Sequence, residues 1–95
     1  MNLHQVILRE EVVLPHFGFE SRKNAAKVAA ALIKIGSPFV DTEAELKAAK
    51  DTNAFRRGSN FGINYFYFKT KAAEKRAAKV AKEIIDKTEE SEWGE

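Results

Sequence analysis

The run from Phe61 to Phe68 constrains the fold more than any other part of the chain, because five of its eight residues are aromatic. Aromatic residues are enriched in β-strands. Side chains alternate across a strand, so one face is predicted to carry Phe61, Ile63, Tyr65 and Tyr67, and the other face Asn64, Phe66 and Phe68. Both faces carry rings, and we expect Phe66 and Phe68 to form a core beneath helices.

Two amphipathic helices are predicted, one before this strand and one after it. The first follows Ser21, a candidate N-cap, runs to Ile35 and stops at Gly36. The second follows Thr70, another candidate cap, and runs over about 71–87. Each helix has small apolar residues on one side and lysines on the other. Their alanine-rich sides are therefore expected to pack closely on a sheet.

Shorter elements are predicted between these two helices. Phe39 and Val40 suit a very short strand. Thr42 with Glu45 three residues later forms a capping-box pattern, which predicts a short helix as far as Lys50. The segment 51–60 is predicted to be a turn-rich connection.

The N-terminal segment is predicted to form β structure, either as one strand or as a hairpin. Gln5 to Leu14 is rich in β-branched and aliphatic residues and ends at Pro15. It suits either one long strand or a hairpin between 6–8 and 12–14, because charged residues interrupt it in the middle. A turn is expected over the four residues from His16 to Phe19.

The order of these elements predicts the α+β class. We expect a small split βαβ (ferredoxin-like) sandwich, with about three antiparallel strands and two long helices packed on one face. Ninety-five residues suit one compact domain, expected over 1–88, followed by an acidic flexible tail over 89–95. The composition, 44% hydrophobic and 32% charged, is typical of soluble globular proteins.

Charge is strongly segregated along the chain. Residues 52–82 hold eight lysines and arginines and one glutamate, whereas residues 83–95 hold six acidic residues and one lysine. The first of these segments is expected to attract anions. The exposed side of the last helix is predicted to be a row of lysines rather than the usual mixture of signs.

Two partial resemblances to known families support the fold class. The segment from Arg57 to Phe68 resembles the third-strand signature of RNA-recognition motifs, in which basic residues, glycines and aromatic residues precede a helix. The segment from Tyr65 to Val80 is similar to the strand-then-helix repeats of peptidoglycan-binding sporulation-related domains. These resemblances imply a small α+β fold, and they assign the chain to neither family.

Residues suited to catalysis are few. His4 and His16 are the only histidines, and no carboxylates accompany them at a spacing typical of metal sites. Cysteine is absent, so thiolate chemistry and disulfides are excluded. We therefore expect no enzyme activity, no metal and no cofactor. The absence of cysteine and of a leader-like segment at the N-terminus predicts a cytoplasmic protein.

The first functional hypothesis is a small non-catalytic nucleic-acid-binding domain. Exposed rings stack on bases while Lys and Arg neutralise phosphates, and this pairing favours single-stranded DNA or RNA. Tyr65 and Tyr67 are the predicted stacking residues, and the predicted phosphate contacts are Arg56, Arg57, Lys69, Lys71, Lys75, Lys79 and Lys82. Alternatively, the tyrosines simply cover the far side of the sheet or a dimer interface.

The second hypothesis is a protein-interaction module, such as a small regulator or inhibitor that docks on a larger and acidic partner protein. Trp93, within the acidic tail, is its candidate docking residue. A homodimer is compatible with both hypotheses, and no membrane partner is expected.

Overall fold

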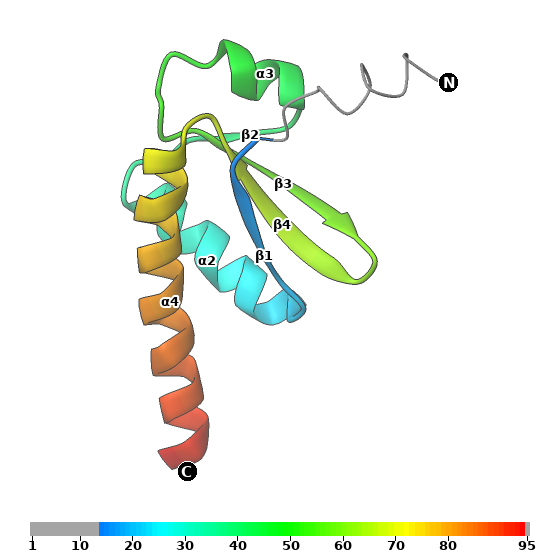
Figure 1. The fold of residues 1–95 in the computed structure, drawn as a ribbon. Coiled ribbons are helices and arrows are strands. Elements are labelled where there is room, and N and C mark those ends of the chain that lie inside the picture. Colours follow the sequence, from blue (N-terminus) through cyan, green and yellow to red (C-terminus); the bar gives the residue numbers. More distant parts are fainter. Residues whose placement is uncertain (1–13, 95) are drawn as a thin grey trace, which may run out of the picture.

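The computed structural model describes residues 14–94, with side chains described for residues 14–87. Four strands and three helices follow one another along this part of the chain (Figure 1). They are β1 (His16–Phe19), α2 (Arg22–Lys34), β2 (Phe39–Val40), α3 (Glu43–Ala48), β3 (Phe55–Asn60), β4 (Ile63–Phe68) and α4 (Lys71–Gly94).

The strands form one mixed sheet in the order β1, β4, β3, β2. β4 pairs antiparallel with β1 and with β3, whereas β2 pairs parallel with β3. The α+β class is therefore confirmed. The expectation of about three antiparallel strands is wrong, because the sheet has four strands and one parallel pair; a ferredoxin-like relationship stays a prediction.

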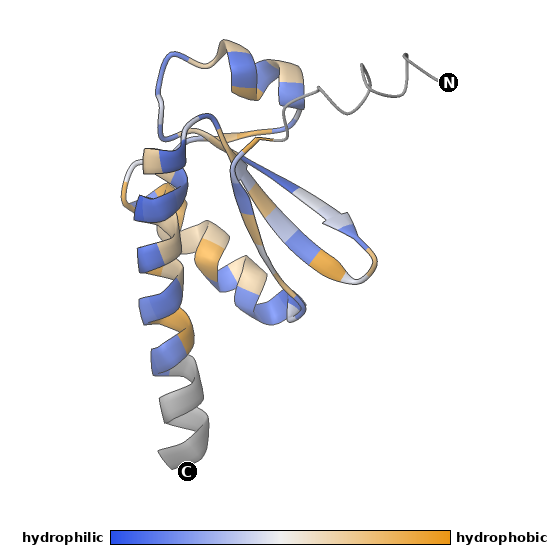
Figure 2. Ribbon diagram, viewed as in Figure 1, coloured by the Kyte–Doolittle hydropathy of each residue, from blue (hydrophilic) through white to orange (hydrophobic). Residues whose placement is uncertain are grey.

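Both α2 and α4 pack on the same face of the sheet, as the amphipathic patterns predict. Phe66 and Phe68 of β4 and Phe55 of β3 are fully buried beneath the helices. Small residues face them, chiefly Ala25 and Val28 of α2 and three alanines of α4, 73, 77 and 81. Figure 2 shows the alternation of hydrophilic and hydrophobic residues along α4 that this packing requires. Alanine lets the helix backbones approach the rings closely.

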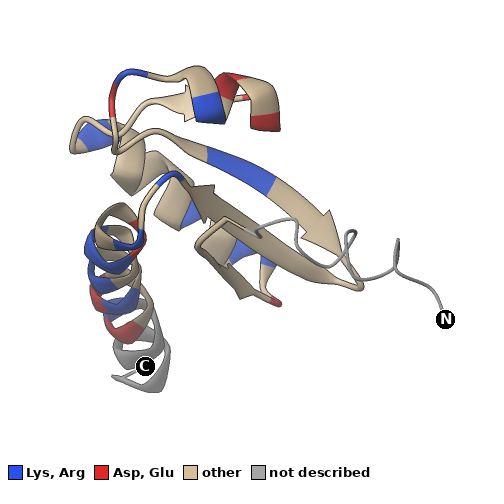
Figure 3. Ribbon diagram, turned by 45° about the horizontal axis from the view of Figure 1, so that its top comes forward, with Lys and Arg blue, Asp and Glu red and all other residues tan. Residues whose placement is uncertain are grey.

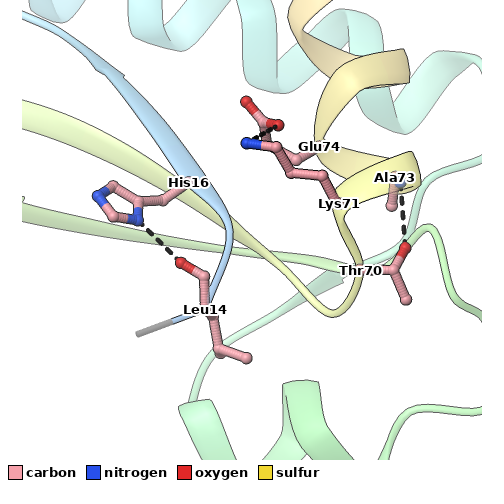
Figure 4. A network of polar contacts seen from close by, with 6 residues as sticks. All are labelled: Leu14, His16, Thr70, Lys71, Ala73 and Glu74. Atoms are coloured by element: carbon pink, nitrogen blue, oxygen red, sulfur yellow. Dashed lines mark hydrogen bonds and ion pairs between the residues drawn. The ribbon is translucent and has the colours of Figure 1, made fainter. Parts of the chain in front are cut away.

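The predicted helix starts are confirmed by their hydrogen bonds. The Ser21 hydroxyl accepts from the N–H of Asn24 at 3.0 Å. Thr42 and Glu45 form the predicted capping box at α3. The Thr70 hydroxyl accepts from the Ala73 N–H at 3.1 Å at the start of α4 (Figure 4). Each side chain satisfies an N–H that the first turn of a helix leaves without a partner.

β1 lies where the sequence predicts a turn. His16 to Phe19 pair in register with the four middle residues of β4, from Tyr67 back to Asn64, and Phe17 and Phe19 point to the helix-covered core. The Phe68 N–H donates to the Pro15 carbonyl at 2.9 Å, so pairing continues to the proline itself. The predicted β segment from Gln5 lies outside the described residues, except for Leu14, which precedes β1 and is not in a strand.

β3 lies within the segment 51–60 that the sequence predicts to be a connection. All six of its residues pair with β4, from Phe55 opposite Phe68 to Asn60 opposite Ile63. The buried ring of Phe55 fixes the strand even though the residues after it are polar. The predicted strand start at Phe61 is also wrong, because Phe61 and Gly62 form the two-residue turn between β3 and β4, with φ values of 52° and 80°.

Helix α4 continues to Gly94, past the predicted end at Lys87. The added segment lacks apolar periodicity but contains several glutamates, which are good helix formers. A flexible acidic tail over 89–95 stays a prediction, as does the single domain over 1–88. No helix in the described range is both long and apolar enough to cross a membrane.

Candidate nucleic-acid interface

The face of the sheet opposite the two long helices carries the predicted stacking residues. Phe66 and Phe68 of β4 point into the core. Because side chains alternate along a strand, Tyr65 and Tyr67 point to the opposite face, in the observed register. We call it the tyrosine face, and its strand residues are His16, Gly18, Val40, Arg56, Gly58, Asn60, Ile63, Tyr65 and Tyr67. Both tyrosines are partly exposed.

Two glycines shape how these rings lie. Gly18 of β1 and Gly58 of β3 stand opposite Tyr65 on its two sides. A Cβ atom on Gly18 would lie 2.7 Å from the Cδ1 atom of Tyr65, and one on Gly58 would lie 3.2 Å from the Cε2 atom of Tyr67. Each ring therefore lies over a neighbouring glycine instead of standing away from the sheet, and the ring centroids are 6.1 Å apart.

Adding a methyl group at Gly18 is expected to cost more stability than adding one at Gly58. The new Cβ of Gly18→Ala would be 2.7 Å from side-chain atoms of both Ile63 and Tyr65 and 3.0 Å from the Asn64 carbonyl oxygen, whereas Gly58→Ala meets only a ring edge and a guanidinium. We expect the first variant to lose about 1–3 kcal/mol in the free energy of unfolding and the second under about 1 kcal/mol. Urea denaturation measures both. Equal losses would contradict the ring placement described above.

His16 and Arg56 extend the aromatic surface. The His16 ring centroid lies 5.5 Å from that of Tyr65 and 5.3 Å from that of Tyr67, and its Nδ1 atom is 2.8 Å from the Leu14 carbonyl oxygen (Figure 4). The Arg56 guanidinium carbon lies 4.8 Å from the Tyr67 ring centroid, within the range of a cation–π interaction. Three strands thus contribute to one cluster of π systems and positive charge.

Arg56 retains capacity to bind an anion. Its Nη1 donates to the Arg57 carbonyl at 3.3 Å, and its Nε is buried without a hydrogen-bond partner among the described residues, so an anion would be bound through Nη2. The four described strands contain two arginines and no acidic residue, and Figure 3 shows this charge pattern on β3. Anionic groups are therefore favoured over cationic ones near this surface.

The other predicted basic residues do not join Arg56. Arg57, its neighbour in β3, points to the helix-covered face, where its guanidinium carbon lies 5.6 Å from the Phe66 centroid. The Lys69 ammonium donates to the Ala49 carbonyl. Lys71 pairs with Glu74 at 3.3 Å (Figure 4). The remaining three, Lys75, Lys79 and Lys82, are exposed on α4.

The structure therefore divides the predicted site residues between two surfaces. Tyr65, Tyr67 and Arg56 lie together on the tyrosine face. The lysines of α4 lie on the helix layer, which covers the other face of the sheet. Trp93 falls in the last turn of α4, where side chains lie outside the described ones.

His16 and the two glycines were not among the predicted site residues. The sequence signal that could have found His16 and Gly18 is the alternation in His16-Phe17-Gly18-Phe19, where two phenylalanines share one face and leave His16 and Gly18 on the other. No group of three or more potential metal ligands occurs within the described residues.

No family model matches the chain, and neither a curated protein nor a solved structure matches it.

Proposed function

We propose that the chain binds single-stranded nucleic acid through the tyrosine face and has no catalytic role. The observation that carries the proposal is the pair of partly exposed tyrosine rings laid over glycines beside Arg56, in strands without acidic residues. Bases of any sequence stack on such rings, and each stacked base contributes about 1–3 kcal/mol. A single strand suits this surface because its bases are free to leave their own stack.

Each residue of the cluster has a distinct role in this proposal. Tyr65 and Tyr67 stack on successive bases, and Arg56 binds the phosphate between or beside them through the N–H groups of its Nη2. His16 extends the ring surface towards β1. The lysines of α4, being on the other layer, raise the local concentration of polyanions through their long-range field and contact phosphates only where a longer strand passes around the sheet edge.

Binding is expected to weaken steeply with salt, and Arg56 is expected to account for part of the slope. For single strands, log K falls by about 0.7 per unit of log salt concentration for each phosphate neutralised. Arg56→Gln is therefore predicted to reduce the slope by about 0.7. Fluorescence anisotropy of a labelled oligothymidylate and a labelled oligouridylate, titrated over a range of salt concentrations, measures the slope.

The matched control is Lys75→Gln/Lys79→Gln on α4. This double variant removes twice the charge of Arg56→Gln, yet it lies away from the tyrosine face, and we expect it to change the slope for a short oligonucleotide less than Arg56→Gln does. A larger change in the salt slope for the lysine variant than for Arg56→Gln would instead assign the binding site to α4. Binding that is absent, or that does not respond to salt, would reject the proposal.

A second candidate function, a protein-interaction module, is favoured by a separate observation. Three large apolar side chains from the end of α2 to β2, Ile33, Ile35 and Phe39, are 54%, 43% and 46% exposed. Exposed apolar clusters often mark docking sites. A pull-down from nuclease-treated lysate separates the candidates, because a module of this kind retains a stoichiometric protein and a nucleic-acid binder does not. Homodimerisation, tested by sedimentation, and a cytoplasmic location remain predictions.

A further inference from the structure

Phe61 combines two unfavourable features at the tip of the β3–β4 hairpin. Its side chain is 94% exposed, so folding gains almost nothing from burying the ring. Its backbone has a φ of 52° and is followed by Gly62 with a φ of 80°. Two-residue turns of this kind favour Asn, Asp or Gly at the first position, since the left-handed region costs other L-residues about 1–2 kcal/mol. Neither local conformation nor packing accounts for a phenylalanine there.

The position of Phe61 relates it to the tyrosine face. Tyr67, Tyr65 and Ile63 follow one another along that face of β4 towards the hairpin tip, at about 6.8 Å per two residues. Phe61 lies two residues before Ile63, in the turn that joins β3 to β4. The same hairpin carries Arg56.

The neighbours of Phe61 in the chain favour a base over a protein surface as its ligand. Ser59, Asn60 and Gly62 around it are small or polar and exposed. Among the described residues, the apolar surface at the tip therefore continues only along the tyrosine face, through Ile63, whereas a protein interface needs a wider apolar patch. A nucleobase needs only one ring to stack on. Its phosphates are complementary to the acid-free strands of the hairpin.

We propose that Phe61 is a third stacking residue, which binds a nucleobase of the same single strand beyond the bases on Tyr65 and Tyr67. This inference rests on the proposed function. It extends the site along β4 to the hairpin tip, so oligonucleotides long enough to reach the tip bind more tightly than shorter ones.

The test is Phe61→Asn, which has opposite expected effects on stability and on binding. Asn is preferred in the left-handed region, so we expect the thermal midpoint to rise by about 2–6 °C. The Kd for a long oligothymidylate or oligouridylate is expected to rise at least about fivefold, because one stacked base is lost. Phe61→Trp keeps a ring and is expected to bind as the unmodified chain does. Ile33→Ala, which removes another exposed apolar side chain, is the matched control and leaves Kd unchanged.

The outcomes separate this inference from the proposed function. An unchanged Kd for Phe61→Asn, together with salt-sensitive binding by the unmodified chain, overturns the role of Phe61 and leaves the tyrosine face as the site. No oligonucleotide binding by the unmodified chain overturns both. A thermal midpoint that falls by several degrees in Phe61→Asn shows that the ring supports the fold, which overturns the inference as well. Crosslinking of a 5-iodouracil oligonucleotide to the peptide that contains Phe61 supports it directly.

Discussion

Replacing Tyr65 and Tyr67 together with alanine is expected to raise the Kd for a single-stranded oligonucleotide by about 30-fold or more, while the chain stays folded. Each ring lost removes a stacking contribution of about 1–3 kcal/mol. The fold survives because both rings are partly exposed on the face opposite the core, where cross-strand pairs contribute only about 0.2–1 kcal/mol each. Anisotropy titration measures binding, and circular dichroism with thermal melting verifies the fold.

Tyr65→Phe/Tyr67→Phe is the control for this prediction. It keeps both rings and removes only the hydroxyl groups, so its Kd is expected to stay within about threefold of the unmodified value if stacking is the dominant interaction. Loss of binding in both double variants would instead assign the contact to the hydroxyl groups. An alanine variant that is folded and binds normally would exclude the tyrosine face as the site.

The largest effect on stability is expected from Phe66→Ala. The Phe66 ring is fully buried, and its centroid lies 5.5 Å from that of Phe17, 5.9 Å from that of Phe19 and 5.9 Å from that of Phe55. Truncating a buried phenylalanine costs about 3–5 kcal/mol in transfer and cavity energy. Since small domains have about 5–15 kcal/mol in total, the variant is expected to be largely destabilised in urea titrations.

Phe61→Ala is the matched comparison, because it makes the same chemical change at a side chain that is 94% exposed. We expect a change of under about 0.5 kcal/mol in the free energy of unfolding. Comparable losses at the two positions would show that the hairpin tip is packed against other parts of the chain, contrary to the described burial.

The helices were predictable because their signals are local. Ser21, Thr42 and Thr70 each cap a helix through a hydrogen bond to a residue three positions later, and this pattern can be found by inspection of the sequence. β3 was not predictable in the same way. Its residues after Phe55 are Arg, Arg, Gly, Ser and Asn, none of which is enriched in strands, and pairing with β4 makes them a strand.

The part of the candidate site that lies on β4 could be predicted from the sequence, because side chains alternate between the two faces of a strand. Tyr65 and Tyr67 were expected on one face and are found there. Arg56 and Arg57 were expected to act together as residues of a connection, but in a strand adjacent residues point to opposite faces, so only Arg56 reaches the tyrosines. His16 and Gly18 join the cluster from β1, and no local pattern indicates which strand pairs with β4.

Because Gly18 and Tyr65 come from distant parts of the chain, the ring arrangement forms only when β1 docks beside a hairpin that folds locally. Pairings between distant segments close late and slowly compared with local ones. The excised hairpin 55–68 would therefore lack the surface on which Tyr65 rests. Nucleic-acid binding is therefore expected to be lost at the same denaturant concentration at which β1 separates from β4.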